Sequence, residues 1–232
     1  MTTLPIPEVA VLDLAGTTIT DDGLVLEAFH AAIADAGVDR GSERFVVMAE
    51  HAERRMGASK ITVFLELFDQ NLAVAERANL AFEQAYASQL TSGCVAPIPG
   101  AAETIDNLRS LGVKVALTTG FSPETRDALL ACVGWRTMAD LALSPADVGR
   151  GRPYPDLALT ALMRLGGTSV SGLLTAGDTV ADMRCGRSAG AGAVIGVLTG
   201  AHSRSALEGA GAHLVIPSIC DLPVSRKGNA TS

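Results

Sequence analysis

The feature that most constrains the fold is the alternation of short apolar runs with helical segments after residue 100. The apolar runs that predict strands are Val113–Leu117, Leu141–Leu143, Gly172–Ala176, Ala193–Val197 and His213–Ile216. The helical segments between them are Ala101–Leu111, a helix opened by Ser122-Pro123-Glu124, Asp156–Leu165 and Ala181–Ala189. This alternation is typical of an α/β domain with a mostly parallel sheet and right-handed crossovers.

A further strand is predicted near the start of the chain, where Val9 to Leu12 form a short apolar run. The run ends in Asp13, and a small turn containing Ala15 and Gly16 follows. A carboxylate at the carboxyl end of a central strand is well placed to attack an electrophile or hold a cation. Because residue 15 is alanine, an enzyme that uses Asp13 as its nucleophile has no general acid two residues further on.

The segment between this strand and residue 96 contains no convincing strand pattern. Helical spacing extends from Leu24 to Ile33 with a stop at Gly37, and further helices are expected at Glu43–Met56, Lys60–Phe68 and Leu72–Leu90. Residues 91–100 have the composition of a linker. We therefore expect a core domain from residues 1–20 and 97–232, with a helical cap domain, residues 21–96, inserted after the first strand.

Composition excludes several classes of function. The net charge is −7 and no run of Lys or Arg could neutralise phosphates, so no nucleic-acid partner is expected. No apolar run approaches the roughly 18 residues needed to span a membrane, and the N-terminus has no signal-peptide pattern, which favours a cytoplasmic protein. The four cysteines are widely spaced and are expected to be free thiols, although their even number leaves a disulfide open: Cys94, Cys132, Cys185 and Cys220.

Polar residues stand at or just after four of the predicted strand ends. They are Asp13; Thr118, Thr119 and Gly120; Arg152; and Asp178 with Asp182. Each has an ordinary structural explanation, as a turn residue, a strand end, a solvated charge or a helix N-cap. Together they suit phosphoryl transfer, because carboxylates bind Mg²⁺ while a cation and a hydroxyl bind the nonbridging oxygens.

These motifs resemble those of the haloacid dehalogenase superfamily, and within it the phosphonatase branch. Asp13-Leu14-Ala15-Gly16-Thr17-Thr18 resembles the first motif in its phosphonatase form, in which alanine replaces the second aspartate of the phosphatases. Thr118, Arg152 in Gly-Arg-Pro-Tyr-Pro, and the segment from Gly177 to Asp182 resemble the other three. The resemblance implies a Rossmann-like α/β core with a helical cap.

The resemblance also implies a role for each site residue. Asp13 is expected to be the nucleophile and a Mg²⁺ ligand, together with the carbonyl of Ala15 and the carboxylate of Asp178, with Asp182 as a further direct or indirect partner of the metal. Thr118 and Arg152 are expected to hold phosphoryl oxygens. The remaining residues expected to bind substrate are Gly16, Thr17, Met56, Thr119 and Gly120.

The cap contains the residue that separates two chemistries. Met56-Gly57-Ala58-Ser59-Lys60-Ile61 resembles the phosphonatase segment whose lysine forms a Schiff base with the aldehyde of phosphonoacetaldehyde. Breaking a C–P bond releases a carbanion, and an iminium on Lys60 would accept its electrons. Most lysines at a helix start are solvated, and a catalytic one must instead lie in a desolvated or cationic pocket. The family segment also carries a histidine where this chain has Val63. His30 and His51 lie in the cap and could substitute for that histidine.

The expected function is Mg²⁺-dependent cleavage of a small β-carbonyl phosphonate through an aspartyl-phosphate. One alternative is a phosphatase of phosphate monoesters in which Lys60 binds substrate by charge alone. A third, from another class, is a protein that binds phosphorylated ligands without turnover. The expected partner is a small phosphonate or phosphorylated metabolite, and the resemblance suggests a homodimer formed through the cap helices.

Overall fold

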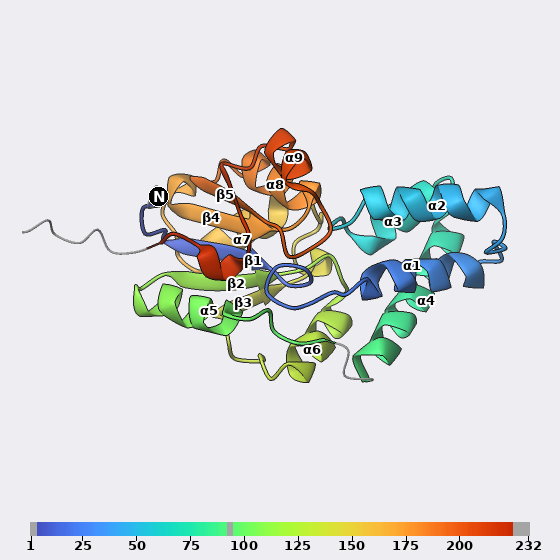
Figure 1. Ribbon diagram of the computed structural model, residues 1–232, viewed down its shortest axis with the longest axis horizontal. Coiled ribbons are helices and arrows are strands. Elements are labelled where there is room, and N and C mark those ends of the chain that lie inside the picture. Colours follow the sequence, from blue (N-terminus) through green and yellow to red (C-terminus); the bar gives the residue numbers. More distant parts are fainter. Residues whose placement is uncertain (1–3, 92–94, 225–232) are drawn as a thin grey trace, which may run out of the picture.

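A six-stranded parallel sheet forms the centre of the protein, as the computed structural model shows for residues 4–91 and 95–224. The strand order is β3-β2-β1-β4-β5-β6, and every neighbouring pair is parallel (Figure 1). The strands are β1 Val9–Asp13, β2 Lys114–Thr118, β3 Leu141–Leu143, β4 Leu173–Gly177, β5 Ala193–Val197 and β6 Leu214–Ile216. The predicted strands are therefore confirmed to within one residue at each end.

The first strand lies in the middle of the sheet, between β2 and β4, with all five of its residues buried. Its register pairs Asp13 with Thr118 at the carboxyl end of β2. The order of strands along the sheet reverses at β1, and ligands of open α/β sheets bind in the crevice beside such a reversal. The topology thus places Asp13 at the point where this fold forms its sites.

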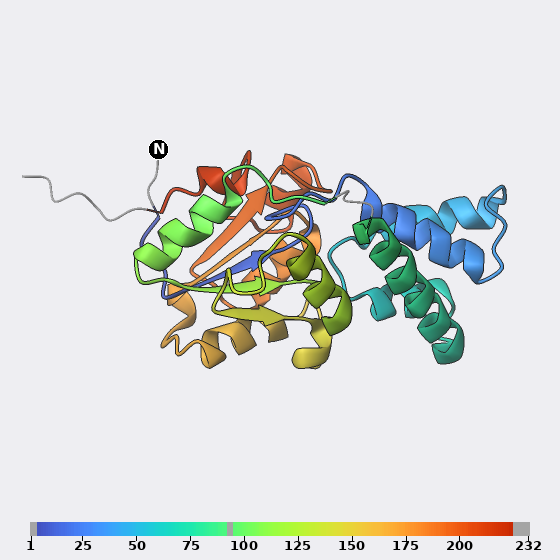
Figure 2. The ribbon, with the colours of Figure 1, turned by 90° about the horizontal axis from the view of Figure 1, so that it is seen from below.

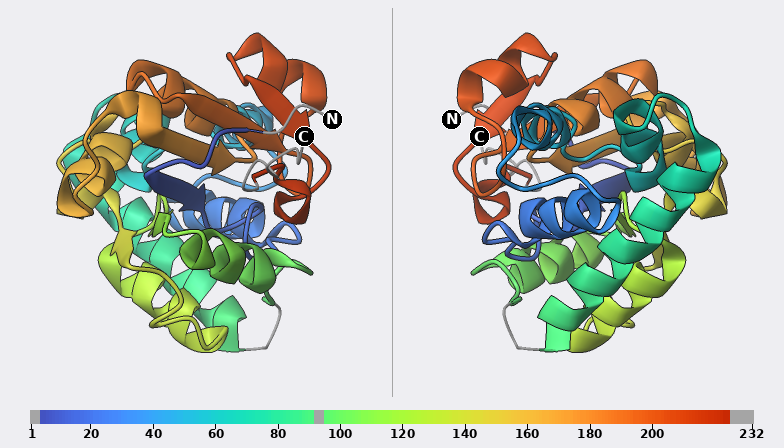
Figure 3. Two further views of the ribbon diagram at one scale, coloured as in Figure 1. Left: turned by 90° about the vertical axis from the view of Figure 1, so that its left-hand side faces the viewer. Right: turned by 90° about the vertical axis from the view of Figure 1, so that its right-hand side faces the viewer.

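Helices cover both faces of the sheet, because the side chains of β1 alternate between them. Ala10 and Leu12 belong to the apolar cluster on the side of α5 (Ala101–Ser110), whereas Val9 and Val11 pack with α7 (Asp156–Arg164). Figure 3 shows these helices on opposite sides of the strands. The other core helices are α6 Pro123–Cys132, α8 Val180–Ser188 and α9 Arg204–Gly209, with short 3₁₀ turns at Pro145–Asp147, Val170–Gly172 and Ile219–Asp221.

Helix starts follow the capping chemistry of the sequence. Ser122 accepts a hydrogen bond from the backbone N–H of Thr125, and Pro123 occupies the first turn of α6 as predicted. Thr179 and Asp182 form a capping box at the start of α8. Helix α9 was not predicted, because six residues carry too little periodicity to be recognised.

Four helices inserted after β1 lie beyond the carboxyl ends of the strands, set apart from the sheet in Figures 1 and 2. They are α1 Leu24–Asp35, α2 Glu43–Arg54, α3 Lys60–Leu67 and α4 Leu72–Thr91. The rings of Phe29, Phe64 and Phe82 meet at their centre, with Phe29 and Phe82 4.8 Å apart. The absence of a strand from residues 21–91 and 95–96 agrees with the sequence pattern, and α5 packs on the sheet with the core.

Three of the four cysteines can be placed. Cys185 is buried, Cys132 and Cys220 are exposed, and all three are free thiols. Cys94 lies outside the described residues. Within the described part of the chain, no helix combines the length and the apolar character that crossing a membrane requires.

Candidate active site

A buried arginine organises the site. Arg152 is only 4% exposed, and its Nη1 lies 2.6 Å from Asp13 Oδ1 and 2.9 Å from Asp182 Oδ1. Its Nη2 donates a 2.7 Å hydrogen bond to Thr118 Oγ1. Burial acts to lower the pKa of Arg152, but the carboxylates of Asp182 and Asp13 outweigh it and raise that pKa. The site therefore holds a permanent cation against the candidate nucleophile.

The carboxyl group of Asp13 experiences opposing influences. Burial raises its pKa most strongly and Asp182 adds to this, whereas Arg152 lowers it by charge and hydrogen bonding. The net result is a raised pKa. Since a carboxylate must be ionised to attack phosphorus, a further cation beside Asp13 would favour its reactive form.

Asp178 is the residue that follows β4, and it contacts the loop after β1. Its Oδ1 accepts a 3.3 Å hydrogen bond from Thr17 Oγ1, and its Oδ2 accepts one from the backbone N–H of Ala201 at 2.8 Å. A Cβ on Gly16 would lie 2.6 Å from Asp178 Oδ2, and Gly16 has a φ of +85°. Glycine is thus required at residue 16 by both backbone conformation and space. The cap of α8 is Thr179, so Asp178 has no capping role there.

The carboxylate of Asp182 is held away from the pocket. Its Oδ1 faces Arg152, and its Oδ2 accepts hydrogen bonds from the backbone N–H and the hydroxyl of Thr179. This carboxylate orients Arg152 and starts α8. The structure therefore places Asp182 behind the arginine, outside the lining of the pocket.

The remaining oxygen donors fit a hard divalent cation. Asp13, Asp178 and Ala15 line one pocket, and burial raises the pKa of both carboxyl groups, with neighbouring carboxylates adding to the rise. Two carboxylates and a carbonyl match the preference of Mg²⁺ for oxygen, with waters completing its shell. Over residues 4–91 and 95–224, no three His, Cys, Asp or Glu side chains are grouped as an all-protein metal site.

Lys60, the first residue of α3, is buried and faces the same pocket. It is 5% exposed, and its Nζ lies 5.4, 5.6 and 5.0 Å from the ring centroids of Phe29, Phe82 and Phe121. Burial lowers the pKa of Lys60 to about 8, against the opposing charges of Asp21, Asp13 and Glu83. The ring faces attract the ammonium, but removal from water has the larger effect. Lys60 is therefore a desolvated amine, unlike the solvated lysine typical of a helix start.

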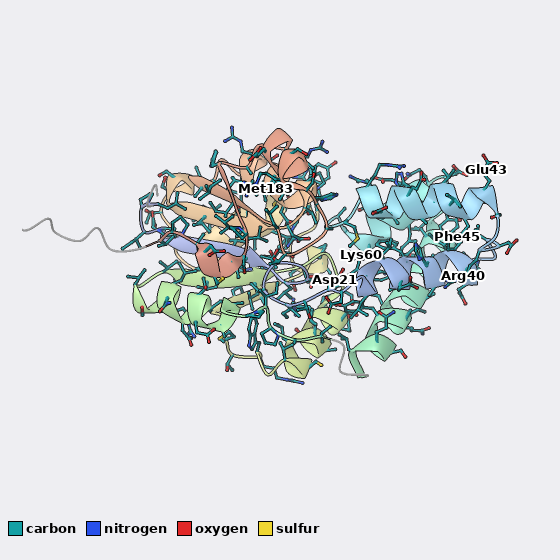
Figure 4. The ribbon with its side chains drawn as sticks, in the orientation of Figure 1. Asp21, Arg40, Glu43, Phe45, Lys60 and Met183 are labelled. Carbon is teal, nitrogen blue, oxygen red and sulfur yellow. The ribbon has the colours of Figure 1, made fainter. Side chains whose placement is uncertain are left out.

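The pocket between core and cap is small, with a cavity volume of about 30 Å³. Eight of the predicted site residues line it: Asp13, Ala15, Met56, Lys60, Thr119, Gly120, Arg152 and Asp178. The other four, Gly16, Thr17, Thr118 and Asp182, lie behind this lining and support it through the contacts described above. Figure 4 shows Lys60 where the cap meets the core.

Five residues of the pocket lining were not predicted from the sequence: Asp21, Val25, Gly57, Phe121 and Thr179. The glycine at residue 57 was the one available signal in the segment around Lys60. The structure explains it, because Gly57 has a φ of +83° and a Cβ there would lie 2.1 Å from Thr179 Oγ1. Phe121 belongs to the core loop after β2, and its position over a cap lysine follows only from the assembled structure.

The cap histidines do not line this pocket. His30 faces Glu27 and the ring of Phe45, and His51 Nε2 lies 2.9 Å from Glu66 Oε2. Val63 is fully buried within the apolar cluster. Neither His30 nor His51 is therefore placed to act beside Lys60.

This α/β fold places Asp13, Arg152 and Asp178 together at the carboxyl ends of the strands. Comparison with family models identifies the class of hydrolases to which the chain belongs. The model for haloacid dehalogenase-like hydrolases matches residues 7–190, and the chain belongs to that family. Phosphonoacetaldehyde hydrolase of Bacillus cereus (strain ATCC 10987 / NRS 248) is 32% identical over 213 residues, which is 83% of this chain and 76% of the relative.

Solved structures agree on the fold. A phosphonoacetaldehyde hydrolase like protein from Oleispira antarctica has a TM-score of 0.78 and 26% identity, covering 94% of this chain and 90% of that one. A hydrolase from Pseudomonas syringae has a TM-score of 0.81 and 24% identity, covering 93% and 95%. The α/β core with a helical insertion after β1 is thus shared across these proteins.

Proposed function

We propose that this hydrolase cleaves the C–P bond of a small β-carbonyl phosphonate, with Asp13 as the nucleophile and Lys60 as the imine-forming residue. The observation that carries the proposal is the burial of Lys60 against three aromatic rings in the pocket that also contains Asp13 and Arg152. With a pKa of about 8, roughly one lysine in ten is neutral at pH 7, against fewer than about one in a thousand for an ordinary lysine. Only the neutral amine attacks a carbonyl.

The residues of the pocket divide the reaction between them. Lys60 attacks the carbonyl carbon, and loss of water gives an iminium. The Asp13 carboxylate attacks phosphorus, and the electrons of the breaking C–P bond move to the iminium nitrogen to give an enamine. Arg152, 2.6 Å from Asp13, neutralises negative charge that develops on the phosphoryl oxygens. Water then hydrolyses the aspartyl-phosphate, and protonation and hydrolysis of the enamine free Lys60.

Enzymes of this family generally use Mg²⁺. Asp13, Asp178 and the carbonyl of Ala15 would hold it, and it would supply positive charge beside the phosphoryl group. The alanine at residue 15 also fits C–P cleavage, because an enamine leaving group needs no acid at that place in the loop.

A phosphatase of small monoesters is the second candidate function. Val63 favours it, because the structure buries this residue where the phosphonatase segment carries a histidine. On this alternative the ammonium form of Lys60 binds the phosphoryl group by charge. The carboxyl group of Asp21, which lines the pocket, would be the available acid for the alkoxide.

The test compares phosphate release from phosphonoacetaldehyde with release from a panel of phosphate monoesters, in the presence of Mg²⁺. Wild type and Lys60→Ala are assayed beside Lys114→Ala, a matched control at an exposed lysine on β2. We expect phosphate from the phosphonate in wild type and the control, and at least a 1000-fold loss in Lys60→Ala, since covalent catalysis is removed.

The opposite pattern would establish the phosphatase. Turnover confined to esters, with Lys60→Ala changing KM more than kcat, would reduce Lys60 to a binding residue. Phosphoryl turnover in wild type that is lost in Asp13→Asn would exclude a protein that only binds its ligand.

A further inference from the structure

We propose that Asp21 is the proton-transfer residue for imine formation on Lys60. The inference rests on the proposed function and extends it to a residue that the sequence motifs do not include. Asp21 lies in the segment that connects the loop after β1 to α1, where the chain passes from core to cap. Its place in one pocket with Lys60 follows from the fold, since the two residues are 39 positions apart in the chain.

Geometry places Asp21 and Lys60 in one pocket. Both line the space that also contains Asp13 and Arg152, and Figure 4 shows them together where the cap meets the core. The backbone N–H of Val25 donates a 3.1 Å hydrogen bond to Asp21 Oδ1, which anchors the carboxyl group at the start of α1. Asp21 is therefore held at the pocket by the same helix that contributes Phe29 to the aromatic wall around Lys60.

Burial shifts both Asp21 and Lys60 toward their neutral forms. Burial raises the pKa of Asp21, against the hydrogen bond from Val25 and the charge of Lys60, while Asp22 adds to the rise. Burial likewise lowers the pKa of Lys60. Carbonyl condensation requires an acid and a neutral amine, and burial shifts the two groups in those directions.

The step balances with these two groups. Neutral Lys60 adds to the aldehyde carbon, and a proton moves from nitrogen to oxygen to give the carbinolamine. Asp21 then donates its proton to the carbinolamine hydroxyl, which leaves as water as the C–N double bond forms. The products are the iminium, one water molecule and the Asp21 carboxylate, which pairs with the new positive charge. In the hydrolytic half of the cycle the carboxylate takes the proton back as water adds to the iminium.

Each of the other acids near Lys60 is held in an ion pair or in at least two hydrogen bonds. Asp13 is bound by Arg152, and Asp178 accepts hydrogen bonds from Thr17 and Ala201 on the phosphoryl side of the pocket. Glu83 accepts hydrogen bonds from the backbone N–H and hydroxyl of Ser122 and from the hydroxyl of Thr125. Asp21 is thus the acid of the described pocket lining that lies outside the phosphoryl site, and its charge acts on Lys60.

The experiment separates this inference from C–P cleavage by using acetaldehyde, which has no phosphorus. Borohydride traps the Lys60 imine, and peptide mass spectrometry measures its rate of formation in wild type, Asp21→Asn and Asp22→Asn. Asparagine keeps an oxygen that can accept from the Val25 N–H, but its amide is not an acid and cannot protonate the carbinolamine. Asp22 is the matched control, since it is exposed and its φ of +45° is one that asparagine tolerates.

We expect trapping in Asp21→Asn to be about 100-fold slower than in wild type, the typical contribution of a positioned acid. Asp22→Asn keeps the acid at residue 21 and loses only a neighbouring charge, so its trapping should stay within about threefold of wild type. Thermal unfolding establishes that each variant is folded, and Asp21→Ser, which also accepts from Val25, replaces the asparagine variant if that one is unstable. Trapping in Asp21→Asn within threefold of wild type would overturn the inference. Trapping in wild type without phosphate release from the phosphonate would contradict the proposed function alone, and no trapping in wild type would overturn both.

Discussion

At the scale of single residues, the decisive feature is a lysine removed from water. The Nζ of Lys60 is surrounded by Phe29, Phe82 and Phe121, and burial lowers its pKa to about 8. The charged groups that face it are Asp21, Asp13, Glu83 and Arg152. A buried ammonium destabilises the folded state relative to the unfolded one, so the burial of this amine lowers stability.

We expect Lys60→Met to raise the free energy of unfolding at pH 7 by about 3 kcal/mol, because a pKa lowered from 10.5 to about 8 corresponds to that much differential charging energy. The sign follows from linkage. Between pH 8 and 10.5 the unfolded chain binds more protons at this lysine than the folded one, so wild type gains stability as pH rises.

Urea unfolding of wild type and Lys60→Met at pH 7 and pH 10.5 measures this difference. The higher free energy of unfolding expected for Lys60→Met should be fully present below pH 8 and nearly gone by pH 10.5. Equal stability of the two proteins at pH 7 would show that Lys60 carries no burial cost. A difference that does not change with pH would assign the gain to packing of the methionine.

At the scale of elements, a cap helix is attached to the start of a core helix. Glu83 on α4 accepts hydrogen bonds from Ser122 and Thr125 in the first turn of α6. Negative charge at a helix N-terminus is favourable, because unpaired N–H groups and the helix dipole point there. Glu83 therefore joins cap to core at the side of the pocket that contains Phe121.

Glu83→Gln should lower the free energy of unfolding by about 1–2 kcal/mol, the range for hydrogen bonds to a charged group in a partly buried place. Glu76→Gln is the control, since it removes the same charge from an exposed residue of α4 and should change stability by less than about 0.5 kcal/mol. Urea unfolding curves of both variants provide the measurement. Equal effects of the two would show that overall charge, and not the attachment of α4 to α6, accounts for the loss.

At the scale of the whole molecule, the pocket exists only because cap and core are in close contact. Lys60 N donates to Gly120 O at 3.4 Å, and a Cβ on Gly120 would lie 2.6 Å from Ala58 O. The loop after β2 and the segment before α3 therefore meet backbone to backbone. This contact brings the cap lysine to the core aspartate and excludes water from both.

Gly120→Ala should hold the cap away from the core and lower kcat/KM for phosphate release at least 10-fold, because displacements of about 1 Å weaken catalysis strongly. Its unfolding midpoint should change by only a few degrees, since the substitution adds one methyl group and removes no apolar side chain. The control is Gly209→Ala at the end of α9, where a Cβ meets nothing within 4 Å. Wild-type kcat/KM in Gly120→Ala would mean that the close contact is not required for turnover.

Much of this organisation was predictable from local pattern. Strand and helix limits followed from periodicity and caps, and β1 was recognised because a buried parallel strand is apolar throughout. The order of the strands in the sheet was not predictable from the individual segments. The limits of the cap at residues 21 and 96 stay a prediction, although α5 packs on the sheet as that division requires.

The sequence by itself determined which polar side chains stand at this edge of the sheet, because Asp13, Thr118, Arg152 and Asp178 end or follow apolar runs of one parallel sheet. Only the tertiary structure decided which of these side chains face the pocket, since Arg152 holds Asp182 and Thr118 behind it. It also decided the burial and lowered pKa of Lys60 and brought Asp21 into the same pocket. The physical reason is that desolvation and charge coupling depend on groups from distant parts of the chain, which local sequence pattern does not encode.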